Sequence, residues 1–180
     1  MISLFAWQVA AADEGLYLPL AERAGWVSVG GYFAFGETLS GGGIKLDGTV
    51  VWDRFAVSIR RNDYVDTGFP RRFFDCLLRF SACKPDTVAT IREAAVHGGL
   101  VKPAKNDQAK ILILSLGPGY VEGEQTGANG SFATLGLSYA ARIVRTTARF
   151  ANWSVEVSGN FNSRQSFAQI GISIGFGLFH

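Results

Sequence analysis

The chain has 180 residues, enough for one domain, and only 18% of them are charged, whereas about a quarter are charged in soluble domains. No run of about 18 apolar residues occurs, which excludes a transmembrane helix. The net charge of +2 and the scattering of Lys and Arg, which never cluster beyond pairs, argue against binding of nucleic acid.

The N-terminal segment 1–12 is apolar and ends in three alanines, like the cleavage region of an export signal. It has no positively charged start, so we interpret it as a residual signal segment. A short amphipathic segment kept in the mature chain is the alternative. Residues 13–180 are expected to form a single domain.

The first three stretches with strand-like alternation are 26–35, 44–52 and 55–61. In the third, Phe55, Val57 and Ile59 share one face, because successive side chains of a strand point to opposite sides. Only Asp53 and Arg54 separate the second stretch from the third. A two-residue connection predicts a tight hairpin between antiparallel neighbours.

The segment 62–91 lacks this alternation and predicts a long loop. It contains Cys76 and Cys83, which are candidates for a disulfide in an oxidising compartment. Two free cysteines in a reducing compartment are the alternative. Apolar residues around them have helical spacing, which suits a short amphipathic helix at a membrane surface. A loop pinned by the disulfide over the mouth of a barrel formed by the strands is the alternative.

Four further stretches alternate before the C-terminal one: 92–101, 109–121, 131–144 and 151–162. The first of these is the weakest, because glycines and alanines dilute it. The second passes through Gly117-Pro118-Gly119. A proline at that point predicts a bulge or the end of the strand.

The last stretch, 169–179, has a bulky apolar residue at every second position and Gly or Ser between them. A soluble sandwich would carry Lys, Glu or Thr on its second face. A face of small residues instead indicates a crowded interior, so the apolar face is expected to contact lipid. The fold class predicted is all-β: a closed antiparallel up-and-down transmembrane β-barrel of about eight strands.

A soluble lipocalin-like barrel that binds an apolar ligand is the alternative architecture. It would need the large apolar residues inside the barrel and the polar ones outside. The two architectures therefore differ in which face of each strand points inward.

Connection lengths support the membrane barrel, because such barrels have short periplasmic turns and longer outer loops. Counted back from a periplasmic C-terminus, the inner connections are short and the outer ones include the two longest, 62–91 and 122–130. Trp26, Trp52, Trp153 and Phe179 then fall near the periplasmic ends. We predict that these aromatics lie at the membrane interface.

Seven polar residues fall on the predicted inward faces: Lys45, Asp47, Arg60, Glu93, His97, Arg142 and Glu156. Both signs of charge are represented. An eight-stranded barrel is just wide enough to be filled by side chains, and unpaired charges in it would be costly. We therefore predict a polar network that fills the lumen.

An enzyme would need a base and a carboxylate within hydrogen-bond reach. His97 is the single plausible base, because the other histidine, His180, is terminal, and Glu93 lies four residues earlier on the same strand face. Lipid A deacylase-type barrels are similar in size, but their His-x-Ser motif is absent, since Gly98 and Gly99 follow His97. The spacing of His, Glu and Cys predicts no metal site, and no cofactor is expected.

The segment 131–179 resembles the C-terminal half of small bacterial outer-membrane β-barrel proteins, an eight-stranded class with porin-like and adhesin-like members. The matching pieces are Gly136-Leu-Ser-Tyr-Ala140, Gly159-Asn-Phe-Asn162 and the glycine-rich final strand. Such proteins end on a Phe that the assembly machinery reads, whereas here His180 follows Phe179.

The resemblance implies a bacterial outer-membrane location and a non-enzymatic structural, surface-interaction or envelope-assembly role. The expected partners are outer-membrane lipid and an envelope protein contacted through the outer loops. A lipid-modifying enzyme that uses His97 and Glu93 is the alternative function.

Overall fold

The computed structural model describes residues 23–36, 40–66, 89–105, 107–125, 130–148 and 150–179. Eight strands occupy most of these ranges: β1 (Arg23–Gly36), β2 (Ser40–Trp52), β3 (Phe55–Asp66), β4 (Ala89–Ala104), β5 (Asp107–Gln125), β6 (Gly130–Ala148), β7 (Ala151–Asn162) and β8 (Phe167–Phe179). No helix in these ranges is both long enough and apolar enough to span a lipid bilayer.

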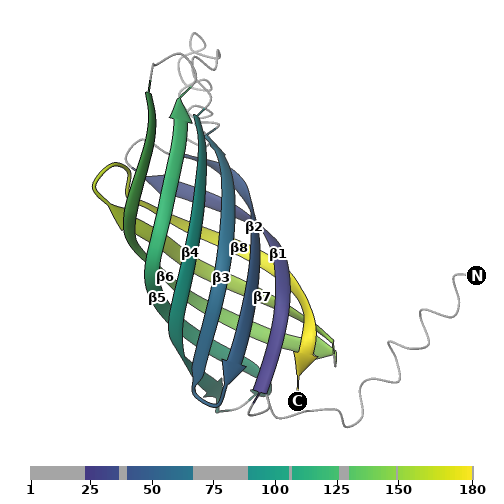
Figure 1. Cartoon of the computed structure of the whole chain (residues 1–180). Helices are drawn as coiled ribbons and strands as arrows, with labels where there is room; N and C mark the ends of the chain where they lie inside the picture. Colours follow the sequence, from purple (N-terminus) through teal and green to yellow (C-terminus); the bar gives the residue numbers. More distant parts are fainter. Residues whose placement is uncertain are drawn as a thin grey trace, which may run out of the picture.

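The strands form one closed barrel in which each pairs antiparallel with its neighbours in sequence (Figure 1). β1 closes the barrel by pairing with β8, so that Ala24 lies opposite Phe179 and Gly36 opposite Phe167. The predicted fold class, a closed up-and-down barrel, is therefore confirmed.

The tight hairpin between β2 and β3 is also confirmed. Trp52 lies opposite Phe55, which leaves only Asp53 and Arg54 in the turn. The φ of Asp53 is 52°, in the left-handed region, which the short polar side chain of Asp tolerates.

Every predicted stretch is a strand, and all but β7 are longer than predicted. β3 continues to Asp66 and β4 begins at Ala89, so the prediction of a loop over 62–91 was wrong at both ends. The inward side chains of Tyr64 and Ile91 join one apolar cluster there, which favours continued pairing. Residues 67–88, with Cys76 and Cys83, lie outside the described residues, as does the segment 1–12.

Pro118 neither ends β5 nor causes a bulge. β5 continues through this residue and pairs with β6 on both sides of it. Toward β4, pairing stops after Ala95–Gly119 and resumes at Gly98–Leu116 in the same register. Proline has no N–H to donate, so the ladder is interrupted without a change of register.

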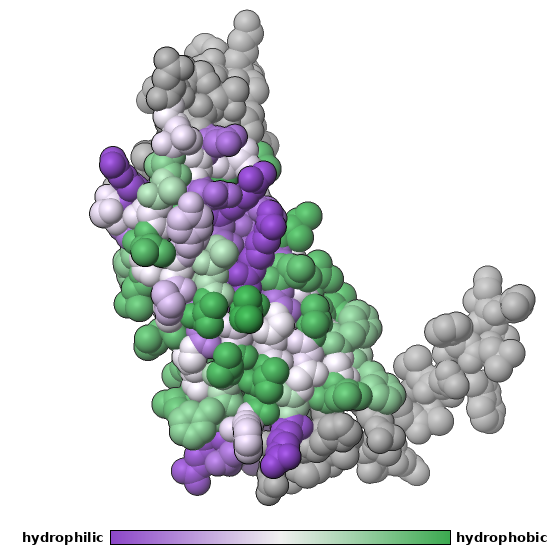
Figure 2. All heavy atoms as spheres, in the orientation of Figure 1, coloured by the Kyte–Doolittle hydropathy of each residue, from purple (hydrophilic) through white to green (hydrophobic). Residues whose placement is uncertain are grey.

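Side chains alternate between an apolar outer face and a polar or small inner face. On the outer face Leu137 is 51% exposed and Ile172 is 62% exposed, whereas Ser173 on the inner face of β8 is buried. Figure 2 shows hydrophobic residues gathered over the lower barrel, with hydrophilic residues above them. A soluble lipocalin-like barrel requires the reverse arrangement, so that alternative was wrong.

The predicted interface aromatics do not all lie on the outer face. Trp52 is 64% exposed at the turn end of β2, and Trp153 is half-buried on the outer face of β7. Trp26 is only 4% exposed and packs in an apolar cluster inside the barrel. It shares the inward face of β1 with Ser28, so its assignment to the interface was wrong. The side chain of Phe179 lies outside what the structure describes.

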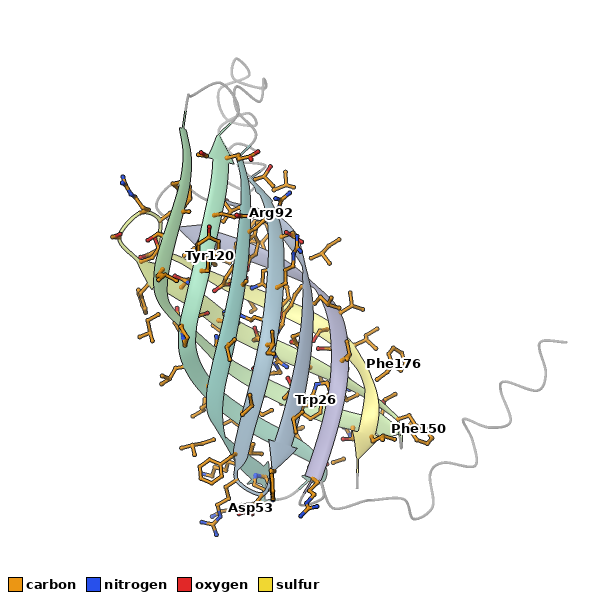
Figure 3. The ribbon with its side chains drawn as sticks, viewed as in Figure 1. Trp26, Asp53, Arg92, Tyr120, Phe150 and Phe176 are labelled. Atoms are coloured by element: carbon orange, nitrogen blue, oxygen red, sulfur yellow. The ribbon has the colours of Figure 1, made fainter. Side chains whose placement is uncertain are left out.

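Three phenylalanines that were not predicted to lie at the interface are exposed near the turn end: Phe55, Phe150 and Phe176. Figure 3 shows Phe150 and Phe176 projecting away from the barrel wall. With Trp52, they give this edge of the apolar belt an aromatic character, as is usual where a barrel meets the membrane interface.

Candidate functional site

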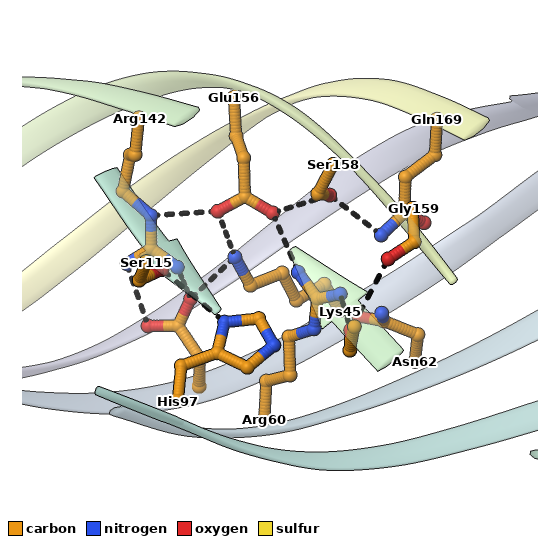
Figure 4. Close-up of polar contacts among 12 residues, drawn as sticks. Lys45, Arg60, Asn62, His97, Ser115, Arg142, Glu156, Ser158, Gly159 and Gln169 are labelled. Carbon is orange, nitrogen blue, oxygen red and sulfur yellow. Dashed lines mark hydrogen bonds and ion pairs between the residues drawn. The ribbon is translucent and has the colours of Figure 1, made fainter. Parts of the chain in front are cut away.

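Six charged side chains gather in the middle of the barrel interior, and Figure 4 labels four of them, Lys45, Arg60, Arg142 and Glu156. They are Lys45 and Asp47 from β2, Arg60 from β3, Glu93 from β4, Arg142 from β6 and Glu156 from β7. All are buried, on the strand faces opposite the apolar belt. Three cations face three carboxylates, so the formal charges of this group balance.

Glu156 is the centre of this charge network because it contacts all three cations. Its Oε2 accepts hydrogen bonds from Lys45 Nζ at 2.6 Å and from Arg142 Nε at 2.7 Å. Its Oε1 accepts from Arg60 Nη1 at 3.2 Å. Arg142 lies directly opposite Glu156 on the neighbouring strand, whereas Lys45 and Arg60 reach across the lumen.

Asp47 lies at one end of the network and accepts hydrogen bonds from three side chains. It accepts from Lys45 Nζ at 2.6 Å and from both terminal nitrogens of Arg142, at 3.2 and 2.6 Å. The hydroxyl of Ser28 on β1 also donates to it at 2.6 Å. The forked contact with Arg142 fixes the orientation of both groups.

Glu93 lies at the other end of the network and accepts hydrogen bonds from four side chains. Arg60 Nη2 donates at 3.3 Å and Asn62 Nδ2 at 2.7 Å. The hydroxyl of Ser138 donates at 2.8 Å and Asn160 Nδ2 at 3.0 Å. Each carboxylate of the network therefore has several donors, which offsets the cost of burying its charge.

Neutral polar side chains extend the network toward the loop end. Ser158 donates to Glu156 at 2.7 Å, and Gln169 Nε2 donates to Ser158 Oγ at 2.7 Å. The hydroxyl of Tyr64 donates in turn to Gln169 Oε1. Residues on β3, β7 and β8 are thereby linked through one continuous set of hydrogen bonds.

Apolar clusters flank the charge network along the barrel axis. The cluster toward the turn end contains Ala24, Trp26, Val51, Ala56, Val101, Ile111, Ile113 and Val144. The cluster toward the loop end contains Tyr32, Ala34, Tyr64, Ile91, Val121 and Phe167. Since the interior of an eight-stranded barrel is just wide enough for side chains, these layers fill the described part of the lumen.

Strand β5 passes so close to the charge network at Gly119 that this position has no space for a side chain. A Cβ on Gly119 would lie 2.9 Å from Ser138 Cβ and 3.4 Å from Glu93 Oε1, and it would also collide with the Asn160 amide. The absence of a side chain at this position lets the donors from β6 and β7 reach Glu93.

His97 is buried in the interior but does not join the charge network. Its Nδ1 lies 3.2 Å from the Ser115 hydroxyl on the neighbouring strand. Four residues along a strand span about 13 Å, so His97 and Glu93 cannot share a proton directly. The structure does not bring together the pair on which the enzyme alternative depends.

Sequence reasoning missed several residues that complete the network: Ser28, Asn62, Tyr64, Ser138, Ser158, Asn160 and Gln169. Most of them could have been found from the sequence, because alternation along the predicted strands places them on the inward face. Asn62 and Tyr64 could not be found in this way, because the sequence pattern places them in the loop over 62–91.

No protein-family model and no curated protein sequence matches the chain. Solved structures do. Ail, the attachment invasion locus protein of Yersinia pestis, is 12% identical, with a TM-score of 0.60 over 88% of this chain and 100% of Ail. Neisserial surface protein A is 7% identical, with a TM-score of 0.60 over 89% of this chain and 98% of that one.

The outer-membrane protein OprG from Pseudomonas aeruginosa is 11% identical, with a TM-score of 0.59 over 89% of this chain and 99% of OprG. Identities this low show the fold alone. The chain has the architecture of small eight-stranded outer-membrane barrels. Its apolar outer belt matches a lipid environment, so it is a transmembrane β-barrel of the outer-membrane type.

Proposed function

We propose that this protein is a non-enzymatic integral protein of a bacterial outer membrane that acts through its outer surface, in structural, surface-interaction or envelope-assembly roles. The observation that carries the proposal is the filled interior, in which three cations meet three buried carboxylates between two apolar clusters. Because the interior of an eight-stranded barrel is just wide enough for side chains, an interior occupied in this way is not expected to admit a substrate or a wide water-filled path.

The surface above the apolar belt offers polar groups for contact. β4, β5 and β6, with 16, 19 and 19 residues, are the longest strands and extend far toward the loop end (Figure 1). On the outer face, Arg92 of β4 lies 3.5 Å from both Asp63 of β3 and Glu122 of β5. A cavity of about 430 Å³ beside them is lined by Arg92, Glu122, Ser131 and Phe132 among others.

The upper part of β6 adds a second contact feature. β7 ends at Asn162 opposite Gly136, so residues 130–135 of β6 pair with β5 on one side and with no residue of β7 on the other. A strand edge of this kind is a template for an added strand from another chain. This supports a protein partner at the loop end.

The comparison with Ail points the same way. Ail is described as an attachment invasion locus protein, and it has been solved in complex with a heparin analogue. Those are properties of Ail. For this chain they support a search for the partner at the loop end, which faces outward if the short turns are periplasmic.

Conductance measurements test whether the interior of the barrel is closed to ions, as the proposal expects. The purified barrel in planar lipid bilayers is expected to add no ion conductance, with a porin of sixteen strands as positive control. Stepwise channel openings in the wild-type protein would contradict it.

Site-specific photo-crosslinking in intact envelopes tests the surface role. A benzoylphenylalanine at Ser131, on the exposed upper part of β6, is expected to form a discrete protein adduct. The same residue placed at Ile172, within the belt, is expected to react with lipid only. Identical products at both positions, or protein adducts at Ile172 alone, would count against a partner at the loop end.

A further inference from the structure

The two edges of the apolar belt differ in charge. Accessible charged residues at the turn end comprise six cations and two anions: Arg23, Arg54, Lys102, Lys105, Lys110, Arg145, Asp53 and Asp107. Above the belt, the accessible charged residues are equal in number: three cations, Arg61, Arg92 and Arg164, and three anions, Asp63, Glu122 and Glu124. The described residues therefore give the turn end a net positive charge and leave the loop end balanced.

A groove opens on the outer face at this positive edge. Its floor is Gly25 on β1, which lies directly between Val50 on β2 and Leu178 on β8. The two bulky side chains are both more than half exposed and rise on either side of the glycine. The resulting cavity measures about 330 Å³ and is also lined by Arg23 and Trp52.

Arg23 closes the groove at its polar end. It lies opposite Trp52 in the β1–β2 pairing, and its guanidinium carbon is 4.9 Å from the centre of the Trp52 ring. Stacking on an aromatic ring restrains the guanidinium without neutralising it. Its fork of donors suits a phosphate oxygen pair, and the apolar walls beside it suit an acyl chain.

We propose that this groove is a binding site for an anionic glycerophospholipid of the periplasmic leaflet. The phosphate contacts Arg23, and one acyl chain lies over Gly25 between Val50 and Leu178. The choice of an anionic lipid rests on the excess of cations at the turn end, since basic residues near a membrane surface attract anionic headgroups.

The test measures lipid retained by the detergent-solubilised barrel, by native mass spectrometry, with dioleoylphosphatidylglycerol and dioleoylphosphatidylcholine as probes. Wild-type protein is expected to prefer the phosphatidylglycerol. Arg23→Gln is expected to weaken its binding about fivefold, the fold-change for about 1 kcal/mol per basic residue. Lys102→Gln removes a charge from the same belt edge but away from the groove, and is expected to have a smaller effect.

A second pair of variants tests the shape of the groove with every charge retained. A Cβ on Gly25 would meet its nearest atoms at 3.8 and 3.9 Å, which is ordinary contact, so Gly25→Leu is expected to fold and to fill the groove. Gly48→Leu adds the same side chain in the middle of the belt, where a Cβ meets nothing within 4 Å. Gly25→Leu is expected to reduce lipid retention at least as much as Arg23→Gln, and Gly48→Leu to leave it unchanged.

Three results would overturn the site. Equal retention of both lipids by the wild type would remove the charge selectivity. Equal losses from Arg23→Gln and Lys102→Gln would indicate a diffuse field of positive charge. Equal retention by Gly25→Leu and Gly48→Leu would show that the groove holds no acyl chain. Heat-modifiable gel mobility verifies that each variant is folded.

Discussion

Neutralising Glu156 tests the charge network at its centre. Glu156→Gln keeps the side-chain shape but removes the one carboxylate that contacts Lys45, Arg60 and Arg142 together. Three buried cations then face only Asp47 and Glu93. The new amide group would also present N–H donors to cations that have no acceptor capacity.

The expected loss of unfolding free energy is about 3–5 kcal/mol, as found when one partner of a buried ion pair is removed. A second substitution restores the balance of charge. Lys45→Met removes one cation that contacts both Asp47 and Glu156, and leaves two cations with two carboxylates. The double variant is expected to be more stable than the sum of the single losses predicts, by about 1–3 kcal/mol.

Urea unfolding in phospholipid vesicles measures these free energies through tryptophan fluorescence, since the chain has four Trp. Gel mobility without heating verifies that the variants are folded at zero urea. If Glu156→Gln loses less than about 1 kcal/mol, as for a surface ion pair, the network does not hold the barrel together. Strict additivity in the double variant would equally refute the coupling.

Three other substitutions are expected to lower stability in the same assay. Gly119→Ala brings a methyl group against Ser138 and is expected to cost about 1–3 kcal/mol, whereas Gly48→Ala, with open space, costs little. Ile172→Arg places a charge in the lipid-facing belt and should cost about 2–4 kcal/mol; a neutral effect would mean that the position lies outside hydrocarbon. Trp26→Ala empties the cluster at the turn end and should cost about 3–5 kcal/mol, and an equal loss from exposed Trp52→Ala would contradict their opposite orientations.

The sequence predicts the strands and their faces well, because alternation with a period of two is a local property. Ile172 and Leu137 face outward as their spacing predicts. Strand ends are predicted less well: at Tyr64 and Ile91 the apolar contacts that continue β3 and β4 come from other strands. Trp26 was also predicted wrongly, because an aromatic residue near a strand end suggested the membrane interface. Its position in the alternation of β1, on the same face as Ser28, places it inside the barrel.

The inward charges could be identified from parity, but their pairing could not. Asp47 lies directly opposite Arg60 on the neighbouring strand, yet its ion pairs are with Lys45 and Arg142. Arg142 reaches Asp47 across the lumen, from β6 to β2. Contacts across a lumen depend on barrel closure, which a linear sequence does not encode locally.

Spin-label accessibility on β8 tests most directly which face of the strands meets lipid. Single labels at Ile172 and Ser173, in a background with Cys76 and Cys83 replaced by serine, are compared by collision with oxygen and with a water-soluble nickel chelate in reconstituted vesicles. The label at Ile172 is expected to collide with oxygen and not with nickel, and the label at Ser173 to be shielded from both. A label at Ile172 that is immobilised and shielded, with Ser173 open to nickel, would contradict the membrane-spanning barrel.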